Sequence, residues 1–253
     1  MTKMKNGIFS VMSYNVWCFH VEEERVNRLM KLIESKSPDT FGVQEATPAW
    51  MQYLAGRFEP PYAHLGQGRD GGDKGEHMCV FYDTARFNFI DGGTRWFTST
   101  PEVSSFCEGA YFPRNMVYAI LEEKATGKRY MHINSHIEPI DGHVTRLLDF
   151  AAQYDLPVIM TGDFNIEEGT ELYEKIVTTP LFGGRTFRDA KFEADKTEDK
   201  FTWHGYGKAD PQKIDFCFVA GKIDVKKYSV CDEKIDGEYP SDHHPLYVEF
   251  QIK

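Results

Sequence analysis

The spacing of hydrophobic and polar residues changes along the chain, and each change predicts where one element ends and the next begins. Residues 8–17 alternate and are rich in strand-forming side chains, which predicts a strand. Residues 22–36 carry apolar side chains at helical spacing, with three glutamates at the start, where the helix dipole favours them. Thr47 and Pro48 suit the N-cap and first turn of a second helix, in which Trp50 lies on the inner face.

The rest of the chain continues this mixture of short strands and helices. Residues 66–77 are rich in glycine and charge and predict a long loop. The chain shows no internal repeat or linker, so we expect one domain over residues 1–253. Because strands outnumber helices and both hairpin and crossover connections occur, a layered α/β fold with mixed sheets is expected. Further strands are predicted at 40–44, 78–82, 86–90, 116–123, 128–136, 156–161, 201–204, 214–219 and 246–252, and further helices at 143–154 and 168–178.

Composition narrows the classes of function. With 41% hydrophobic and 14% aromatic residues, the chain can build a sizeable core, so a disordered protein is excluded. The formal net charge is −10 and no long basic run occurs, which argues against a protein that coats DNA or RNA. A small or locally presented phosphate-bearing substrate stays open, because a metal ion can supply positive charge that the side chains lack.

Cysteine usage and the N-terminal segment bear on the compartment. The apolar stretch that follows residues 1–7 is too short for a signal-peptide core or a membrane span. We therefore expect a soluble cytoplasmic protein with no membrane partner, and its oligomeric state stays open. The five cysteines are odd in number and form no CxxC pair, so neither a disulfide framework nor a zinc-thiolate site is indicated: Cys18, Cys79, Cys107, Cys217 and Cys231.

Polar residues stand at or near the ends of several predicted strands, where α/β folds commonly gather active sites. Carboxylate and amide oxygens are hard ligands that suit Mg²⁺ or Mn²⁺. An aspartate paired with a histidine can act as an acid–base pair. Such a combination favours metal-assisted hydrolysis at phosphorus. The residues are Asn15, Glu45, Asn134 with His136, Asp163 with Asn165, Asp215, and Asp242 with His243.

Each of these residues also has a plain structural interpretation. Asn15 and Asp215, taken singly, are typical of strand-end residues that bond the backbone. His244 competes with His243 for the acid–base role, although the Ser-Asp-His order favours His243. The charged loop 69–76 is interpreted either as a substrate rim or as a mobile loop.

The order of these motifs resembles that of the endonuclease/exonuclease/phosphatase superfamily of metal-dependent phosphoesterases. The resemblance runs from Ser13-Tyr14-Asn15 to Ser241-Asp242-His243 and therefore covers nearly the whole chain. It implies a four-layer α/β/β/α sandwich with two packed mixed sheets flanked by helices. Trp17 stands where some nuclease members carry an acidic residue, which is a departure from their ligand set.

The resemblance also implies roles for the polar residues. Glu45 would be the principal metal ligand, with Asn15 assisting and Asp242 beside the metal or its waters. Asp163 would orient or deprotonate the attacking water. The remaining residues would contact the phosphoryl group or support those that do: Asn134, His136, Asn165 and His243 as contacts, and Asp215 as the partner that holds His243.

The expected activity is hydrolysis of a phosphoester bond, as a phosphodiesterase or phosphatase, with Mg²⁺ or Mn²⁺ as cofactor. A nuclease that acts on DNA or RNA is the alternative, and a strong inverse dependence of activity on salt would favour it. A sphingomyelinase-like lipid activity ranks third. A catalytically silent module that binds a phospholigand is the alternative from a different class.

Overall fold

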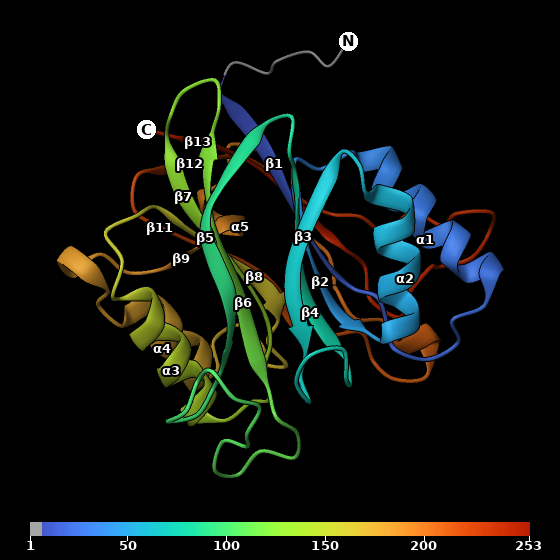
Figure 1. The fold of residues 1–253 in the computed structure, drawn as a ribbon, viewed down its shortest axis with the longest axis horizontal. Coiled ribbons are helices and arrows are strands. Elements are labelled where there is room, and N and C mark those ends of the chain that lie inside the picture. Colours follow the sequence, from blue (N-terminus) through green and yellow to red (C-terminus); the bar gives the residue numbers. More distant parts are fainter. Residues whose placement is uncertain (1–6) are drawn as a thin grey trace.

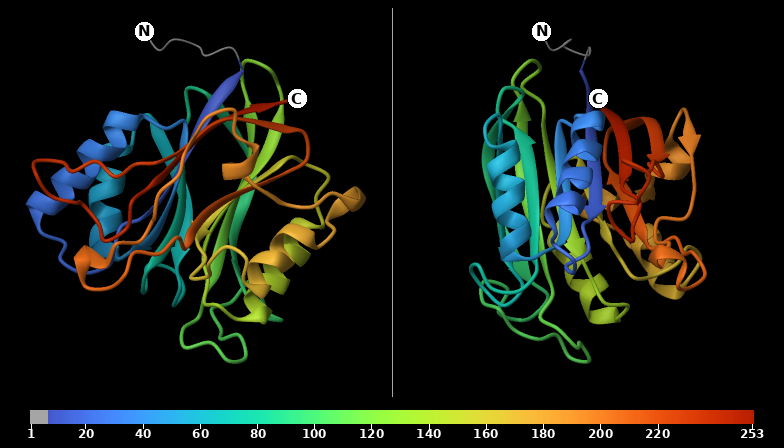
Figure 2. Two further views of the ribbon diagram at one scale, coloured as in Figure 1. Left: turned by 180° about the vertical axis from the view of Figure 1, so that it is seen from behind. Right: turned by 90° about the vertical axis from the view of Figure 1, so that its right-hand side faces the viewer.

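Strands of alternating and continuous apolar pattern assemble into two sheets that stack on each other, with helices over both outer faces (Figures 1 and 2). The computed structural model describes residues 7–253. Residues 1–6, on which the expectation about a signal peptide partly depends, lie outside the described range. Both sheets are mixed. In the first sheet β1 is parallel to β2 and antiparallel to β13, and in the second β7 is parallel to β8, which is antiparallel to β11. The expected α/β/β/α sandwich is confirmed.

The seven-stranded sheet has the order β10-β12-β13-β1-β2-β4-β3 and the six-stranded sheet the order β5-β6-β7-β8-β11-β9. The first contains β1 (Ile8–Asn15), β2 (Thr40–Ala46), β3 (Tyr62–Gly68), β4 (His77–Asp83), β10 (Thr197–Glu198), β12 (Ile223–Val230) and β13 (Leu246–Ile252). The second contains β5 (Phe87–Trp96), β6 (Asn115–Glu123), β7 (Arg129–His136), β8 (Val158–Asp163), β9 (Arg188–Asp189) and β11 (Asp215–Ala220). The helices are α1 (Glu23–Lys36), α2 (Pro48–Phe58), α3 (Asp141–Ala151), α4 (Glu171–Thr178) and the short α5 (Ala190–Glu193).

Three apolar layers hold the sandwich together. Helices α1 and α2 bury their inner faces, including Trp50, on the first sheet, and α3 and α4 cover the second. Between the sheets, Phe9 of β1 packs on Tyr130 of β7 with ring centroids 4.7 Å apart. Full burial of each such ring contributes roughly 1.5–3 kcal/mol. This central layer fixes how the strand ends of one sheet face those of the other.

The helix starts follow the local sequence signals. The hydroxyl of Thr47 accepts a hydrogen bond from the backbone N–H of Trp50 at 3.4 Å, and Pro48 occupies the first turn of α2, as predicted. None of the helices in residues 7–253 has the length and apolar character needed to cross a membrane. All five cysteines are free thiols.

The strand predicted at residues 201–204 is wrong. Only isolated bridges form there, from Trp203 to Gln212 and to His243, because this segment folds back over the site instead of joining a sheet edge. Strands β3 and β12 were not predicted from the sequence. Glycines interrupt β3, and charged residues occupy the partly exposed positions of β12. The predicted loop 66–77 shrinks to residues 69–76 between β3 and β4.

Candidate active site

Strand direction and register bring the predicted polar residues to one end of the sandwich. Asn15 closes β1, His136 closes β7 and Asp163 closes β8. Asp215 opens β11, and because β11 runs antiparallel to β8, it lies opposite Asp163; His136 lies opposite Asp163 on the other side. Side chains from both sheets therefore meet around Asp163.

Asn15 joins the two sheets across this edge. Its Nδ2 donates to Glu45 Oε1 and to Asp163 Oδ2, each at 3.0 Å, while its Oδ1 accepts from the backbone N–H of Trp17 at 2.9 Å. Glu45 Oε2 accepts from the backbone N–H of Cys18 at 3.1 Å. Glu45 also has a left-handed backbone (φ 58°), a conformation that non-glycine residues adopt where the surroundings impose it, often at functional sites.

His243 and Asp215 form a buried acid–base pair. Nδ1 of His243 and Oδ2 of Asp215 are 2.8 Å apart, which turns Nε2 towards Asp163 Oδ2 at 3.8 Å. Burial by itself would lower the pKa of His243, but the charges of Asp215 and Asp163 outweigh it and raise the pKa to about 10. The imidazole is therefore positively charged at neutral pH.

Asp163 is poised to exchange a proton near neutral pH. Burial and the neighbouring charges of Asp215 and Glu45 raise its pKa to about 7, against the opposing effects of His243 and Asn15. A carboxylate with a pKa near the working pH is suited to general base chemistry.

His136 contributes a neutral imidazole to the same cluster. Burial first, and then the nearby charges of Arg114 and His243, hold its pKa well below the usual range. Its Nε2 lies 3.5 Å from Asp163 Oδ2, and its buried Nδ1 has no hydrogen-bond partner among the described residues. A neutral imidazole is the form that binds metal ions.

A divalent cation fits this donor set. Ligand atoms of Glu45, His136 and Asp163 all lie within 4.8 Å of one another. Two carboxylates in a buried place repel each other unless protons or a cation balance them, and hard oxygen donors suit Mg²⁺ or Mn²⁺. The second close group, Asp163 with Asp215 and His243, contains a charged imidazole and is less suited to a cation.

Asn134 lies outside the cluster, in contrast to its expected contact with the phosphoryl group. Its side chain is fully buried between the sheets, where Oδ1 accepts from Gln44 Nε2 at 2.6 Å and Nδ2 donates to the backbone oxygens of Val43 and Cys79. Asn134 shares a face of β7 with His136, as strand periodicity predicts. It lies two residues further from the strand end, between the sheets. Its donors already serve to join the sheets.

Asp242 and Asn165 border the cluster. Asp242 Oδ2 accepts from the indole N–H of Trp203 at 3.3 Å, and burial, with a further contribution from Glu45, raises its pKa. The backbone N–H of Asn165 donates to Asp163 Oδ1 at 3.0 Å, and its side chain donates to the Ile137 oxygen at 3.0 Å. Asn165 thus orients the carboxylate of Asp163.

His244 turns away from the cluster and stacks on His204, with ring centroids 4.4 Å apart. The two adjacent histidines of the C-terminal motif therefore point to different partners. Of the two, only His243 faces Asp163.

Charged residues outside the predicted set complete one wall of the site. Arg69 Nη1 lies 2.6 Å and Arg114 Nη1 3.9 Å from Glu76 Oε2. Burial raises the pKa of Glu76, Arg69 opposes this rise, and Glu45 adds to it. The backbone N–H of Arg69 donates to the Glu76 oxygen at 2.9 Å, so the 69–76 loop closes as a hydrogen-bonded turn beside the site. In the sequence, the charged residues between the glycines of this loop were the signal that could have indicated its position beside the site.

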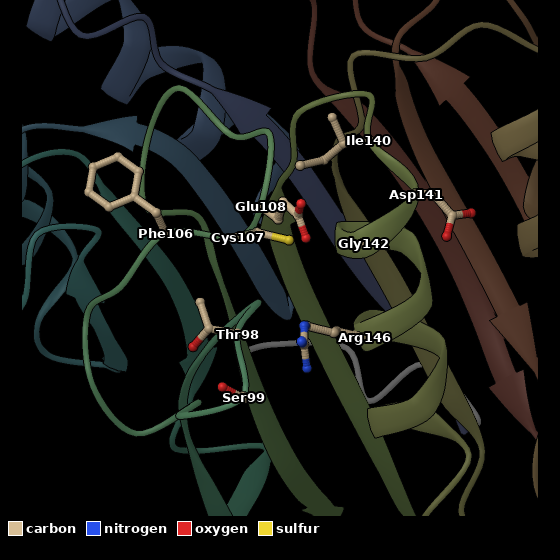
Figure 3. Close-up of a pocket in the computed structure, with 9 residues that line it drawn as sticks. All are labelled: Thr98, Ser99, Phe106, Cys107, Glu108, Ile140, Asp141, Gly142 and Arg146. Atoms are coloured by element: carbon tan, nitrogen blue, oxygen red, sulfur yellow. The ribbon is translucent and has the colours of Figure 1, made fainter.

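A separate cavity of about 500 Å³ lies at the N-terminus of α3 and against the 98–108 segment (Figure 3). Arg146 of α3 points into it, across from Cys107 and Glu108. None of the nine residues predicted for catalysis or metal binding lines this cavity. This hollow is therefore distinct from the cluster of predicted residues at the strand ends.

The four-layer sandwich, with a carboxylate–histidine cluster at one end, is the architecture of layered α/β proteins that resemble phosphoesterases. The chain belongs to the Endonuclease/Exonuclease/phosphatase family, whose family model matches residues 12–243. Members of this family are typically phosphoester hydrolases and generally use divalent metals. Comparison with curated proteins gives no significant match.

Solved structures agree with this assignment. An endonuclease/exonuclease/phosphatase from Bacteroides vulgatus is 25% identical, with 97% of this chain and 99% of its own covered and a TM-score of 0.89. The mannosyl-6-phosphatase of Bacteroides thetaiotaomicron is 26% identical, with 96% and 99% covered and a TM-score of 0.82. D. rerio TDP2, solved with a single-strand DNA product, is 22% identical, with 97% and 100% covered and a TM-score of 0.74, and it shares the fold.

Proposed function

We propose that the protein is a Mg²⁺- or Mn²⁺-dependent hydrolase of phosphoester bonds in small or locally presented substrates, and that residues 1–253 act as one catalytic domain. The observation that carries this proposal is the position of Asp163. Its carboxylate lies between a group suited to a cation (Glu45 and His136) and a charged histidine (His243 with Asp215).

The chain's own residues divide the work. Asp163 accepts the proton of the attacking water, since its pKa lies near neutrality. His243, kept charged by Asp215, stabilises negative charge on the phosphoryl oxygens. In-line attack then forms the bond from the water oxygen to phosphorus and breaks the bond to the leaving oxygen, which takes a proton from solvent, and the configuration at phosphorus inverts.

Glu45 would hold the cation, with His136 as the second donor and Asn15 and Asp242 beside them. When bound, the cation would supply positive charge that stabilises the phosphoryl oxygens. His136 thus takes a ligand role in place of the phosphoryl contact expected from the resemblance, because its imidazole is neutral and close to both carboxylates.

Two observations favour a small substrate. The chain resembles a mannosyl-6-phosphatase at 26% identity, which supports a phosphomonoester. The net charge of −10 argues against a long nucleic acid as the substrate, because phosphate backbones are gripped by basic surfaces. The fold shared with TDP2 adds no support for a nuclease.

The test measures p-nitrophenol release from p-nitrophenyl phosphate and bis(p-nitrophenyl) phosphate with Mg²⁺, Mn²⁺ or EDTA. Turnover should require the metal, and the preferred substrate separates phosphatase from phosphodiesterase. Asp163→Asn and His243→Ala should each lower kcat by ~10²–10⁴-fold, because each removes a positioned group.

Matched variants control for non-specific effects. Asp149→Asn on the exposed side of α3 and His244→Ala, whose ring faces away from Asp163, should keep wild-type turnover. Circular dichroism should show an intact fold in all four variants. Near-wild-type rates in both site variants would refute the site, and metal binding without turnover in the wild type would support the silent phospholigand-binding module.

A further inference from the structure

A group of aromatic side chains lies beside the Glu45 end of the site. Trp17 is the centre of this group, with ring centroids 5.8 Å from Phe19, 5.2 Å from His20 and 5.2 Å from Tyr206. Phe19 is 62% exposed, and Trp17 and Tyr206 are half-buried. We call Trp17, Phe19, His20 and Tyr206 the aromatic platform. It joins the segment after β1 to the 205–207 turn, which lie side by side (Figure 2).

One buried arginine holds this platform from below. Arg25 of α1 is only 5% exposed, and its guanidinium lies 5.2 Å from the Trp17 ring centroid. Its Nη1 donates to the backbone oxygens of Phe19 at 2.7 Å and His20 at 3.1 Å, and its Nη2 donates to that of Trp17 at 3.2 Å. The segment is therefore fixed before any ligand arrives, which reduces the entropy lost on binding.

Three residues of the platform have a backbone conformation that is strained for non-glycine residues. Trp17, His20 and Tyr206 all have left-handed φ values, of 57°, 53° and 53°. Residues with a Cβ avoid this region, and glycine would serve there without strain. Strained residues that persist under a dense set of hydrogen bonds are characteristic of binding and catalytic sites. In the platform, the Trp17 and Tyr206 rings lie half-buried against each other, with the exposed Phe19 ring beside Trp17.

The platform is continuous with the catalytic cluster. The backbone N–H of Trp17 donates to Asn15 Oδ1 at 2.9 Å. On the other side, the backbone N–H of His204, which precedes the turn with Tyr206, donates to the Asp242 oxygen at 3.0 Å. The platform therefore borders the cluster on the side of Asn15 and Asp242, where the organic group of a bound phosphoester would meet these rings.

We propose that the aromatic platform binds the face of a ring in the substrate's organic group, so that the substrates are phosphoesters of ring-bearing alcohols, either sugars or nucleosides. A nucleobase presents a flat π face and a sugar ring presents a face of C–H groups, and either packs on the accessible part of an indole or phenyl ring. This inference rests on the proposed phosphoester hydrolase function and names its substrate class.

The test compares kcat/KM for a hexose 6-phosphate, a nucleoside 5′-monophosphate and acyclic glycerol 3-phosphate. Trp17→Ala and Phe19→Ala should each lower kcat/KM about tenfold for the preferred ring-bearing substrate and leave glycerol phosphate nearly unchanged, the size expected for one lost stacking contact. Trp17→Phe should restore most of the rate. Phe192→Ala is the matched control, since Phe192 is 65% exposed on α5, away from the platform.

Selective loss with the hexose phosphate identifies a sugar, and selective loss with the nucleotide identifies a nucleoside. Equal loss on all three substrates, or no loss, would overturn the platform while leaving the hydrolase function standing. If the wild type turns over none of them, p-nitrophenol release decides the hydrolase proposal separately, and binding decides the platform. Tryptophan fluorescence titrations in EDTA should then show about tenfold weaker binding of the preferred ligand by Phe19→Ala. Equal affinity or no binding would refute it.

Discussion

Three histidines in or beside the second sheet show how burial and neighbouring charge assign protons. Burial alone lowers the pKa of His132 to about 3, and burial with nearby cations holds that of His136 well below its usual value. His243 is just as buried, yet paired carboxylates raise its pKa to about 10. The same residue type is therefore neutral at His132 and His136 and charged at His243, where the directly paired Asp215 and the nearby Asp163 outweigh the cost of burial.

His132 makes stability depend on pH. It lies between Thr40 of the first sheet and Thr161 of the second, 2.9 Å from the Thr161 hydroxyl. Because its folded pKa of about 3 is below its usual 6.5, its contribution is complete above pH 6.5 and is lost as pH falls towards 3. His132→Gln should therefore flatten the acid decline in the free energy of unfolding by ~1.4 kcal/mol per pH unit.

Urea unfolding at several pH values between 7 and 4 measures this slope. His20→Gln is the control, since His20 is exposed in the loop after β1. Parallel curves for wild type and His132→Gln would show that His132 takes up its proton in the folded state.

At the scale of elements, glycines set how closely the strands approach. A Cβ on Gly162 of β8 would lie 2.0 Å from the Ser135 oxygen of β7, and Gly162 has φ 151°. The glycine thus allows the two strands to approach closely. Gly42 of β2 similarly leaves room for the buried amide of Asn134, 2.4 Å from where a Cβ would stand.

Two alanine substitutions should have opposite effects. Gly162→Ala should destabilise the protein by ~2–4 kcal/mol, because either β7 or β8 must move. Gly56→Ala, on the exposed side of α2 with open space around it, should stabilise it by ~0.5–1 kcal/mol through helix propensity. Chemical denaturation measures both changes. A neutral Gly162→Ala variant would contradict the tight β7–β8 contact.

At the scale of the whole molecule, the candidate cation site spans the two sheets. Glu45 comes from the first sheet and His136 and Asp163 from the second, so a bound cation would tie the two sheets together where β2, β7 and β8 end. Cation binding and global stability should therefore be linked.

Saturating Mn²⁺ or Mg²⁺ should raise the Tm relative to protein in EDTA by about 5–10 °C, the shift expected at ~100 times Kd for a protein of this size. Glu45→Gln should abolish most of this rise, because the principal ligand loses its charge. Glu24→Gln, on the exposed side of α1, should retain it. A rise that persists in Glu45→Gln, measured by differential scanning fluorimetry, would place the cation elsewhere.

Local signals predicted the elements that depend on local physics. The helical spacing of α1, the Thr47 cap of α2 and the long strands of the core were all visible, because each rests on residues close in sequence. Strands β3 and β12 were missed because glycines interrupt β3 and charged residues occupy the partly exposed positions of β12. The segment 201–204 looked like a strand but has no sheet partner, which only its neighbours in space decide.

The sequence by itself determined the fold class, the family resemblance and the residue types of the site, since strand periodicity and motif order are properties of the chain. The tertiary structure decided which of those residues meet. Two-residue periodicity put Asn134 and His136 on one face, but the packed sheets buried the first and left the second at the cluster. Only the packing brought Arg69, Glu76 and Arg114 to the wall of the site and Arg25 beneath Trp17. Such contacts join residues far apart in sequence, and the burial and charge that set their chemistry exist only once the two sheets have closed on each other.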